Sequence, residues 1–151
     1  MKIAHQIKIT VFSYEKDNED ENLALEKLLQ LIPFNIKDKK KAFHKTETQG
    51  FNEKKIIIFE IFLEKEKHTN KFLENLTGNL DAHQKNIILG QLESRLDDNL
   101  SFFLRFDKEE HIKNSRLVLT DSGNCFHIEI AIAAFPRRKK VAIGVVRRIF
   151  S

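Results

Sequence analysis

The sequence predicts an α+β fold: a single domain with a largely antiparallel sheet and helices packed on one face. Segments in which apolar and polar residues alternate are typical of half-buried strands, and several occur in this chain. They come in adjacent groups rather than in strict alternation with helical segments, which favours antiparallel pairing. The length of 151 residues is that of one domain, and we expect residues 1–151 to form it.

The first half of the chain contains three predicted strands and one predicted helix. Residues 3–13 and 54–63 alternate strongly, and the lysine-rich residues 39–47 permit a third strand. Between 3–13 and 39–47, leucines at helical spacing predict a helix. This helix is expected to begin with a cap at Asn18 and to end near Pro33, because the residue before a proline avoids the helical conformation.

The second half begins with two predicted helices, which Thr69 and Asp81 are expected to cap. Strands are predicted at residues 100–106 and 125–135, and Pro136 is predicted to begin a last helix. The buried side of that helix is expected at three positions, Val141, Val145 and Ile149. Its segment is rich in β-branched residues, so a strand there is the alternative.

The strand at 100–106 carries an arginine among phenylalanines. Because side chains alternate between the two faces of a sheet, the apolar residues from Leu100 to Phe106 at even positions point to the core. Phe103 and Arg105 then lie on the opposite face. The same rule puts residues of the other strands on that second face: Gln6, Lys8, Thr10, Phe12, Ile58, Glu60, Phe62, His127 and Glu129.

A sheet face of this mixed composition has two interpretations. Sheets that bind single-stranded RNA use aromatic rings that stack on bases, together with cations that hold phosphates. The alternative is an ordinary solvated face, on which Glu60 and Glu129 simply pair with the neighbouring cations.

The formal net charge is +4, and the cations are concentrated in two segments. Five lysines lie between Lys37 and Lys45, and six arginines and lysines lie in the last 15 residues without any acidic residue. Such patches attract polyanions, although a lysine run alone is also typical of a solvated surface. We expect the lysines near position 40, the corner from Arg105 to Lys108 and residues 137–140 to converge into one cradle for polyphosphate.

Two other groups of residues are weaker candidates for chemistry. Cys125 and His127 lie two residues apart on one strand face, as a thiol nucleophile and its base could. Asp97, Asp98 and Asp107 bracket a strand and could gather magnesium in a nuclease, but they are typical of caps and turns. No spacing of histidines and cysteines indicates a metal site, so neither a metal nor a cofactor is expected.

The composition also indicates a compartment. A single cysteine excludes an internal disulfide and is typical of proteins in a reducing environment. No segment is long and apolar enough for a membrane span, and residues 1–6 turn polar too soon for a signal peptide. We therefore expect a cytoplasmic protein without a membrane partner.

The segments "LESRLDDNLSFFLRFDKEEHIKNSRLVL" and "CFHIEIAIAAFP" together resemble an archaeal family of predicted exosome subunits or RNA-binding proteins. The resemblance spans nearly the whole chain and includes the basic ending "AAFPRRKKVAIGVVRRIF". The motif positions are Arg95, Leu96, Asp97, Leu104, Arg105, Phe106, Asp107 and Lys108. One departure is the loop "KAFHKTETQGFNEKK", in which His44, Gly50 and Asn52 stand at a stretched spacing, so the role of the family's loop does not carry over.

The resemblance implies a fold similar to that of the ribosomal protein that binds 5S RNA, a role in RNA binding and a link to the exosome. We therefore predict a non-catalytic RNA-binding protein of an RNA-processing or ribosomal setting. The predicted RNA-binding residues are Lys39, Lys40, Lys41, His44, Lys45, Arg95, Phe103, Arg105, Lys108, Arg137, Arg138, Lys139 and Lys140. The alternative is an adaptor that joins proteins of such an assembly without touching RNA.

Overall fold

The computed structural model describes residues 1–14, 21–36, 39–50 and 54–151, without the side chains of Lys39 and Lys40. Its strands are β1 (Ala4–Tyr14), β2 (Phe43–Gln49), β3 (Lys55–Leu63), β4 (Ser101–Asp107) and β5 (Cys125–Ile132). Its helices are α1 (Glu21–Gln30), α2 (Lys39–Ala42), α3 (Glu66–Gly78), α4 (Ala82–Leu89), α5 (Lys108–Asn114) and α6 (Lys139–Phe150). The predicted cap at Asn18 and the loop residue Asn52 lie outside the described residues.

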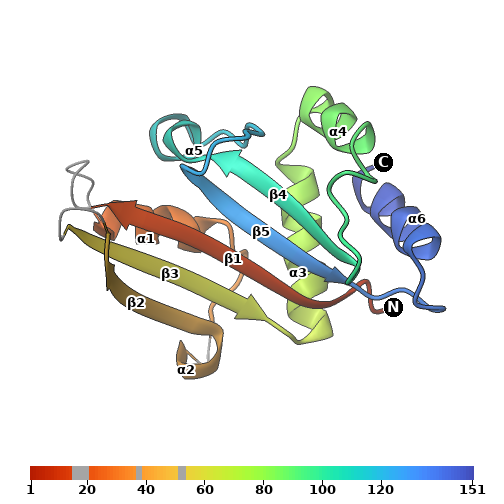
Figure 1. Cartoon of the computed structure of the whole chain (residues 1–151), viewed down its shortest axis with the longest axis horizontal. Helices are drawn as coiled ribbons and strands as arrows, with labels where there is room; N and C mark the ends of the chain where they lie inside the picture. Colours follow the sequence, from red (N-terminus) through yellow and green to blue (C-terminus); the bar gives the residue numbers. More distant parts are fainter. Residues whose placement is uncertain (15–20, 37–38, 51–53) are drawn as a thin grey trace.

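The five strands form one open sheet in the order β2-β3-β1-β5-β4, and every neighbouring pair is antiparallel (Figure 1). The predicted single-domain α+β class with an antiparallel sheet is confirmed. β2 and β4 are the two edge strands, so segments that flank them lie on opposite sides of the molecule. The segment predicted as a strand at 39–47 is split, since its first four residues form α2.

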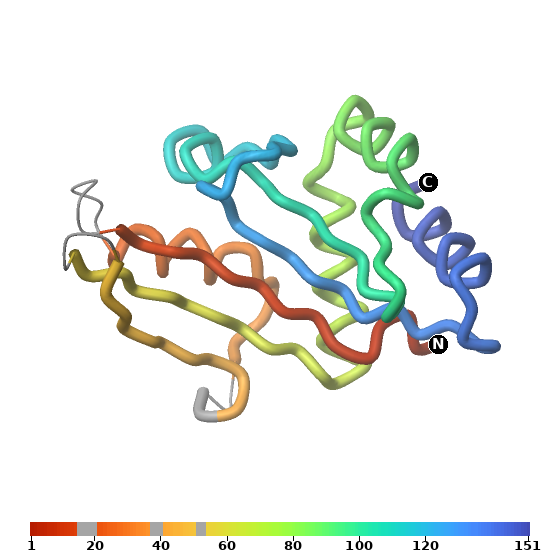
Figure 2. Tube along the Cα trace, in the orientation of Figure 1, coloured from red at the N-terminus to blue at the C-terminus, as the bar shows by residue number. Residues whose placement is uncertain are grey.

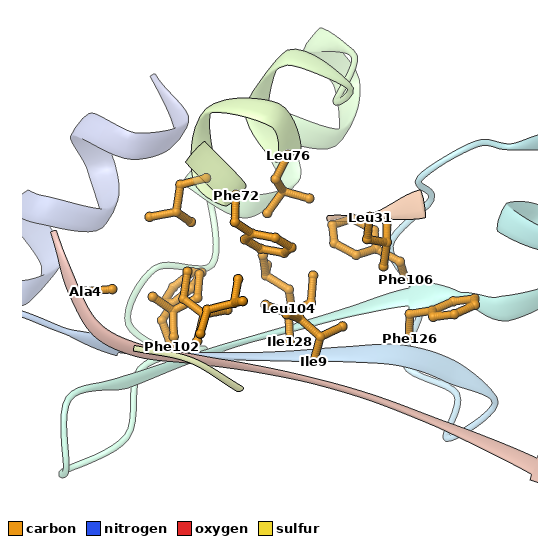
Figure 3. Packing of buried hydrophobic residues seen from close by; sticks show 14 of the residues in the cluster. Ala4, Ile9, Leu31, Phe72, Leu76, Phe102, Leu104, Phe106, Phe126 and Ile128 are labelled. Carbon is orange, nitrogen blue, oxygen red and sulfur yellow. The ribbon is translucent and has the colours of Figure 1, made fainter. Parts of the chain in front are cut away.

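One face of the sheet is buried against helices. α1 and α3 contact β1, and α6 contacts β5. Figure 3 shows Phe72 of α3 pointing toward Leu104 of β4 and Ile9 of β1. Fully buried phenylalanines fill this layer: Phe59, Phe72, Phe102, Phe106, Phe126 and Phe150. Each such burial stabilises the fold by about 1.5–3 kcal/mol, which makes this layer the main support of the sheet.

The alternation in β4 predicted the two faces correctly. Phe102, Leu104 and Phe106 are completely buried, whereas Phe103 is half-buried and Arg105 is exposed. The described helices leave the face with Phe103 and Arg105 uncovered, and we call it the open face (Figure 2).

Two helix predictions need correction. Thr69 does not cap α3, which begins three residues earlier; its buried hydroxyl instead donates to the Glu66 carbonyl at 3.1 Å. The last segment is helical but begins at Lys139 rather than at Pro136. The predicted buried side is wrong by one residue, since the buried positions are Ala142, Val146 and Phe150. The predicted positions Val141, Val145 and Ile149 are partly buried around this stripe.

The cap of α4 is as predicted, because the Asp81 carboxylate accepts the Gln84 backbone N–H at 2.8 Å. Within the described ranges, none of the helices has the length and apolar character needed to cross a membrane.

Candidate nucleic-acid interface

The open face is hollowed near its centre. This central hollow has a volume of about 420 Å³. Its lining is Lys8, Thr10, Phe12, Ile58, Glu60, Arg105, Gly123, Cys125 and His127. Most of the residues predicted for the second face line this hollow, whereas Gln6, Phe62, Phe103 and Glu129 do not.

The strand register aligns these side chains in rows that cross the sheet. The first row is His44, Glu60, Thr10, His127 and Arg105, from β2 to β4. The second row is Phe62, Lys8, Glu129 and Phe103, from β3 to β4. The second row has an aromatic ring at each end and an oppositely charged pair, Lys8 and Glu129, between them, and both rows reach the β4 edge.

A second hollow of about 520 Å³, the edge hollow, lies at that edge. Its lining is Gln91, Ser94, Arg95, Phe103, Arg105, Thr120, Asp121 and His127. Arg105 and His127 line both hollows, so the two are adjacent. The ring centroids of Phe103 and His127 are 5.7 Å apart, which gives the edge hollow an aromatic wall.

Two arginines line the edge hollow, Arg95 from the turn after α4 and Arg105 from β4. Arg95 is positioned by its neighbours: its Nε donates to Gln91 Oε1 at 2.9 Å and its Nη1 donates to the Phe103 carbonyl at 3.2 Å. Arg105 is exposed and donates Nη1 to the Asp121 carbonyl at 3.3 Å. Because a guanidinium has five N–H donors, both groups retain donors for an anion.

Burial affects the protonation of the central residues. It lowers the pKa of His127; the charges of Arg105 and Lys8 act in the same direction, and Glu129 opposes them. His127 is therefore neutral near pH 7, so its ring can stack on a base or exchange hydrogen bonds with it. Burial raises the pKa of the Cys125 thiol, which keeps it protonated and removes support for its role as a nucleophile.

Lys108 corrects a site prediction. Its side chain is 2% exposed, donates to the Phe12 carbonyl and lies 5.6 Å from the centre of the Tyr14 ring. A phosphate on the surface cannot reach this ammonium group. The burial of this ammonium group at the backbone of β1 counts against the prediction that Lys108 binds RNA.

The three basic segments do not converge. Figure 1 shows α2 and α6 far apart, and the Arg105 end of β4 is separate from both. The prediction of one continuous cradle is therefore wrong, because β2 and β4 form opposite edges of the sheet. Lys45 is on the helix-facing side of β2, where it pairs with Glu21 at 3.1 Å. His44 is on the open face, and its Nε2 lies 3.2 Å from the Lys41 carbonyl.

The basic start of α6 is exposed, and two of its residues contact the turn that precedes β4. Arg137 Nη2 donates to the Asn99 carbonyl at 3.3 Å, and Lys139 Nζ lies 3.4 Å from Asp98 Oδ1. Arg138 and Lys140 are exposed beside them. This group lies next to the start of β4, whereas the edge hollow contains the later residue Arg105.

The three aspartates of the nuclease hypothesis have separate structural roles. Asp97 accepts the backbone N–H groups of Asn99 and Ser101, and Asp107 caps α5. Asp98 pairs with Lys139. In the part of the chain that the structure describes, no three histidine, cysteine or acidic residues are grouped so that they could hold a metal ion.

One cluster of cations is not among the predicted site residues. Lys65 directly precedes α3, Lys67 and Lys71 lie in its first turns, and all three line a hollow together with Lys41 of α2. The signal was present in "KEKHTNK", but lysines on a predicted helix are typical of a solvated surface. Only the pairing of β2 with β3 brings Lys41 to the other three.

Comparisons with known proteins identify the family. The sequence profile of a family described as RNA binding matches residues 6–133, most of the chain. The chain belongs to this RNA-binding family. Family membership confirms the resemblance to an archaeal RNA-binding family, while the exosome link and the likeness to the ribosomal protein stay predictions.

Relatives of the family agree with this assignment. The chain is 29% identical over 144 residues to the RNA-binding protein PAB1135 of Pyrococcus abyssi, covering 95% of this chain and 92% of that protein. Among solved structures, AF2318 of Archaeoglobus fulgidus has a TM-score of 0.82 at 21% identity, covering 97% of this chain and 99% of that one. Mth689 of Methanothermobacter thermautotrophicus has a TM-score of 0.77 at 23% identity, covering 99% and 100%. These two likenesses show the shared fold.

Proposed function

We propose that this protein is a non-catalytic RNA-binding protein, and that the open face is where RNA binds. The observation that carries the proposal is the edge hollow, in which two arginines from different elements converge beside the Phe103–His127 aromatic wall. Family membership and the name of the Pyrococcus relative support the same ligand.

The side chains of the open face indicate how an RNA strand lies on it. Arginine binds phosphate with several charge-assisted hydrogen bonds, so Arg95 and Arg105 are suited to hold the backbone at the β4 edge. Glu60 and Glu129 further inside repel phosphates but can accept hydrogen bonds from base amino groups. The arginines then hold one end of the RNA backbone at the β4 edge while bases face the sheet, where stacking contributes about 1–3 kcal/mol per base.

The test is RNA affinity as a function of salt, measured by filter binding or fluorescence anisotropy. Arg105→Gln should weaken binding and lower the salt slope by about 0.7, the value for one single-strand phosphate contact. Phe103→Leu should weaken binding with an unchanged slope, because it removes stacking but no charge.

Arg116→Gln is the matched control, since Arg116 is also exposed and lines neither hollow. It should leave the RNA affinity and its salt slope unchanged. An RNA affinity that changes neither with salt nor with the Arg105 substitution would contradict the proposal.

The second candidate function is that of an adaptor in an exosome or ribosomal assembly. An apolar hollow of about 840 Å³ beside α1 favours it. Its lining is Leu25, Leu29, Ile32, Pro33, Phe34, Asn35, Ile36 and Phe43, and Leu29 is 43% exposed. A protein that retards no RNA but co-purifies with such subunits would favour the adaptor. The buried free thiol of Cys125 supports a cytoplasmic location for either role.

A further inference from the structure

A third hollow, of about 640 Å³, is lined by residues of α2, the end of β3 and the start of α3. Figure 1 shows where these elements lie. Four exposed lysines line it, and we call them the lysine corner: Lys41, Lys65, Lys67 and Lys71. They come from two helices and the loop before α3. None of them belongs to the edge hollow or the central hollow.

Two acidic residues lie near the lysine corner, and one of them, Glu64, lines the same hollow. Glu64 accepts a hydrogen bond from Gln6 at 3.0 Å, and Glu66 pairs with the terminal ammonium group of Met1 at 3.3 Å. Within the described residues, no ion pair joins Lys65, Lys67 or Lys71 to a carboxylate. The residues that line the hollow thus include four lysines and one carboxylate, that of Glu64, which is a local excess of positive charge in a concave surface and suits an anion.

The same hollow has aromatic walls. The rings of Phe34 and His68 are stacked, with centroids 4.3 Å apart and planes inclined by 17°. Phe62 also lines this hollow, and His44 packs against its ring edge-on at 5.3 Å. Cations beside aromatic faces are the combination that holds both the backbone and the bases of a single strand.

The lysine corner and the edge hollow lie at the two ends of the second row. Phe62 lines the hollow of the lysine corner, and Phe103 lines the edge hollow. Lys8 and Glu129 lie between them in the row. β3 and β4 are three strand spacings apart, which is about 14 Å. An RNA strand that crosses the sheet along this row can reach both groups of cations without passing over a helix.

Resting on the proposed function, we infer that the lysine corner is a second phosphate-binding site for the same RNA, so that one unpaired strand spans the open face. The ligand is a single strand rather than a duplex. Bases in an A-form duplex are stacked inside the helix, where Phe62 and Phe103 cannot reach their faces.

The test compares oligoribonucleotides from a dinucleotide to about 16 nucleotides, the upper site size of one single-strand-binding domain. A dinucleotide has one phosphodiester group and cannot occupy both sites at once. Wild-type affinity should therefore rise with length. The Lys67→Gln/Lys71→Gln double variant should lose most of that rise, and its salt slope on the longest oligonucleotide should fall by about 1.4, twice the value for one phosphate.

The matched control is Lys85→Gln/Lys113→Gln, which removes the same charge from α4 and α5 outside the hollows. It should behave as wild type, and thermal unfolding of both double variants checks that they are folded. An Arg105-sensitive affinity that the lysine-corner variant leaves unchanged at every length overturns the inference but leaves the proposed function intact. Equal affinity for a duplex of the same length also overturns the inference. Wild-type protein that binds no RNA contradicts the proposed function itself.

Discussion

His111 illustrates how one buried side chain connects separate elements. Its Nε2 donates to the Lys27 carbonyl of α1 at 2.9 Å, and its ring packs edge-on against Phe126 at 4.9 Å. Its Nδ1 is buried without a hydrogen-bond partner in the described structure. Burial lowers the pKa of His111, the bond to the Lys27 carbonyl opposes this shift, and the Lys27 charge adds to it. The native state therefore holds a neutral ring.

We predict that the free energy of unfolding falls as the pH drops below the unfolded-state pKa of histidine, about 6.5. The unfolded state then takes up protons that native His111 resists, and the loss is complete once the pH is below the native pKa. Urea titrations between about pH 7.5 and about pH 5.5 measure this slope. His111→Gln should reduce the slope without abolishing it, because burial lowers the pKa of His127 as well. Equal slopes for the two proteins would contradict the role given to His111.

At the scale of one element, α4 is stabilised at its start by the contact between Asp81 and Gln84. The Asp81 carboxylate accepts the Gln84 N–H, and the side chain of Gln84 is itself buried, with its Oε1 accepting the Leu119 N–H at 2.9 Å. The cap thus also positions the segment between α5 and β5.

Asp81→Ala should lower the free energy of unfolding by about 1 kcal/mol, the usual loss for a helix cap, and Asp81→Asn should retain most of it. Chemical unfolding measures both. Asp98→Ala is the control, because that carboxylate is fully exposed in a surface ion pair. A loss as large for Asp98→Ala as for Asp81→Ala would show that the cap is not the cause.

Elements were predictable where a local pattern decides them. Alternation assigned Phe103 and Arg105 to the open face, because neighbouring side chains in a strand must point in opposite directions. The buried side of α6 was missed because Val141 and Ala142 are both apolar, and spacing alone does not distinguish adjacent stripes. Thr69 was read as a cap because its hydroxyl suits that role; inside a helix the same group bonds to a carbonyl of the preceding turn.

Strand order is a property of the whole molecule, and local patterns do not encode it. The cradle was expected from three basic segments, but the position of β2 and β4 at opposite edges separates them. The edge hollow and the lysine corner arise in the same way, since each joins residues that are distant in sequence. Arg105 was predicted from the motif, whereas Lys67 and Lys71 gained significance only once β3 placed α3 beside α2.

The basic start of α6 should act on RNA by general attraction. Replacing Arg137, Arg138, Lys139 and Lys140 together by glutamine should weaken binding to all RNA sequences alike. The effect should shrink strongly at about 1 M salt, where the Debye length is only about 3 Å. The loss from Phe103→Leu should persist there, because stacking is not screened. Titrations at low and high salt separate the two, and a sequence-dependent loss would contradict this role.

The burial of Lys108 has a consequence for anyone who maps this protein by mutagenesis. Its ammonium group fastens the corner between β4 and α5 to the backbone of Phe12, whose ring lines the central hollow. We expect a substitution of Lys108 to alter the shape of the central hollow, so a screen that measures RNA binding alone would assign this structural residue as an RNA contact. Thermal unfolding of the same variants without RNA separates a structural contact from an RNA contact, because only loss of a structural contact lowers the melting temperature of the free protein.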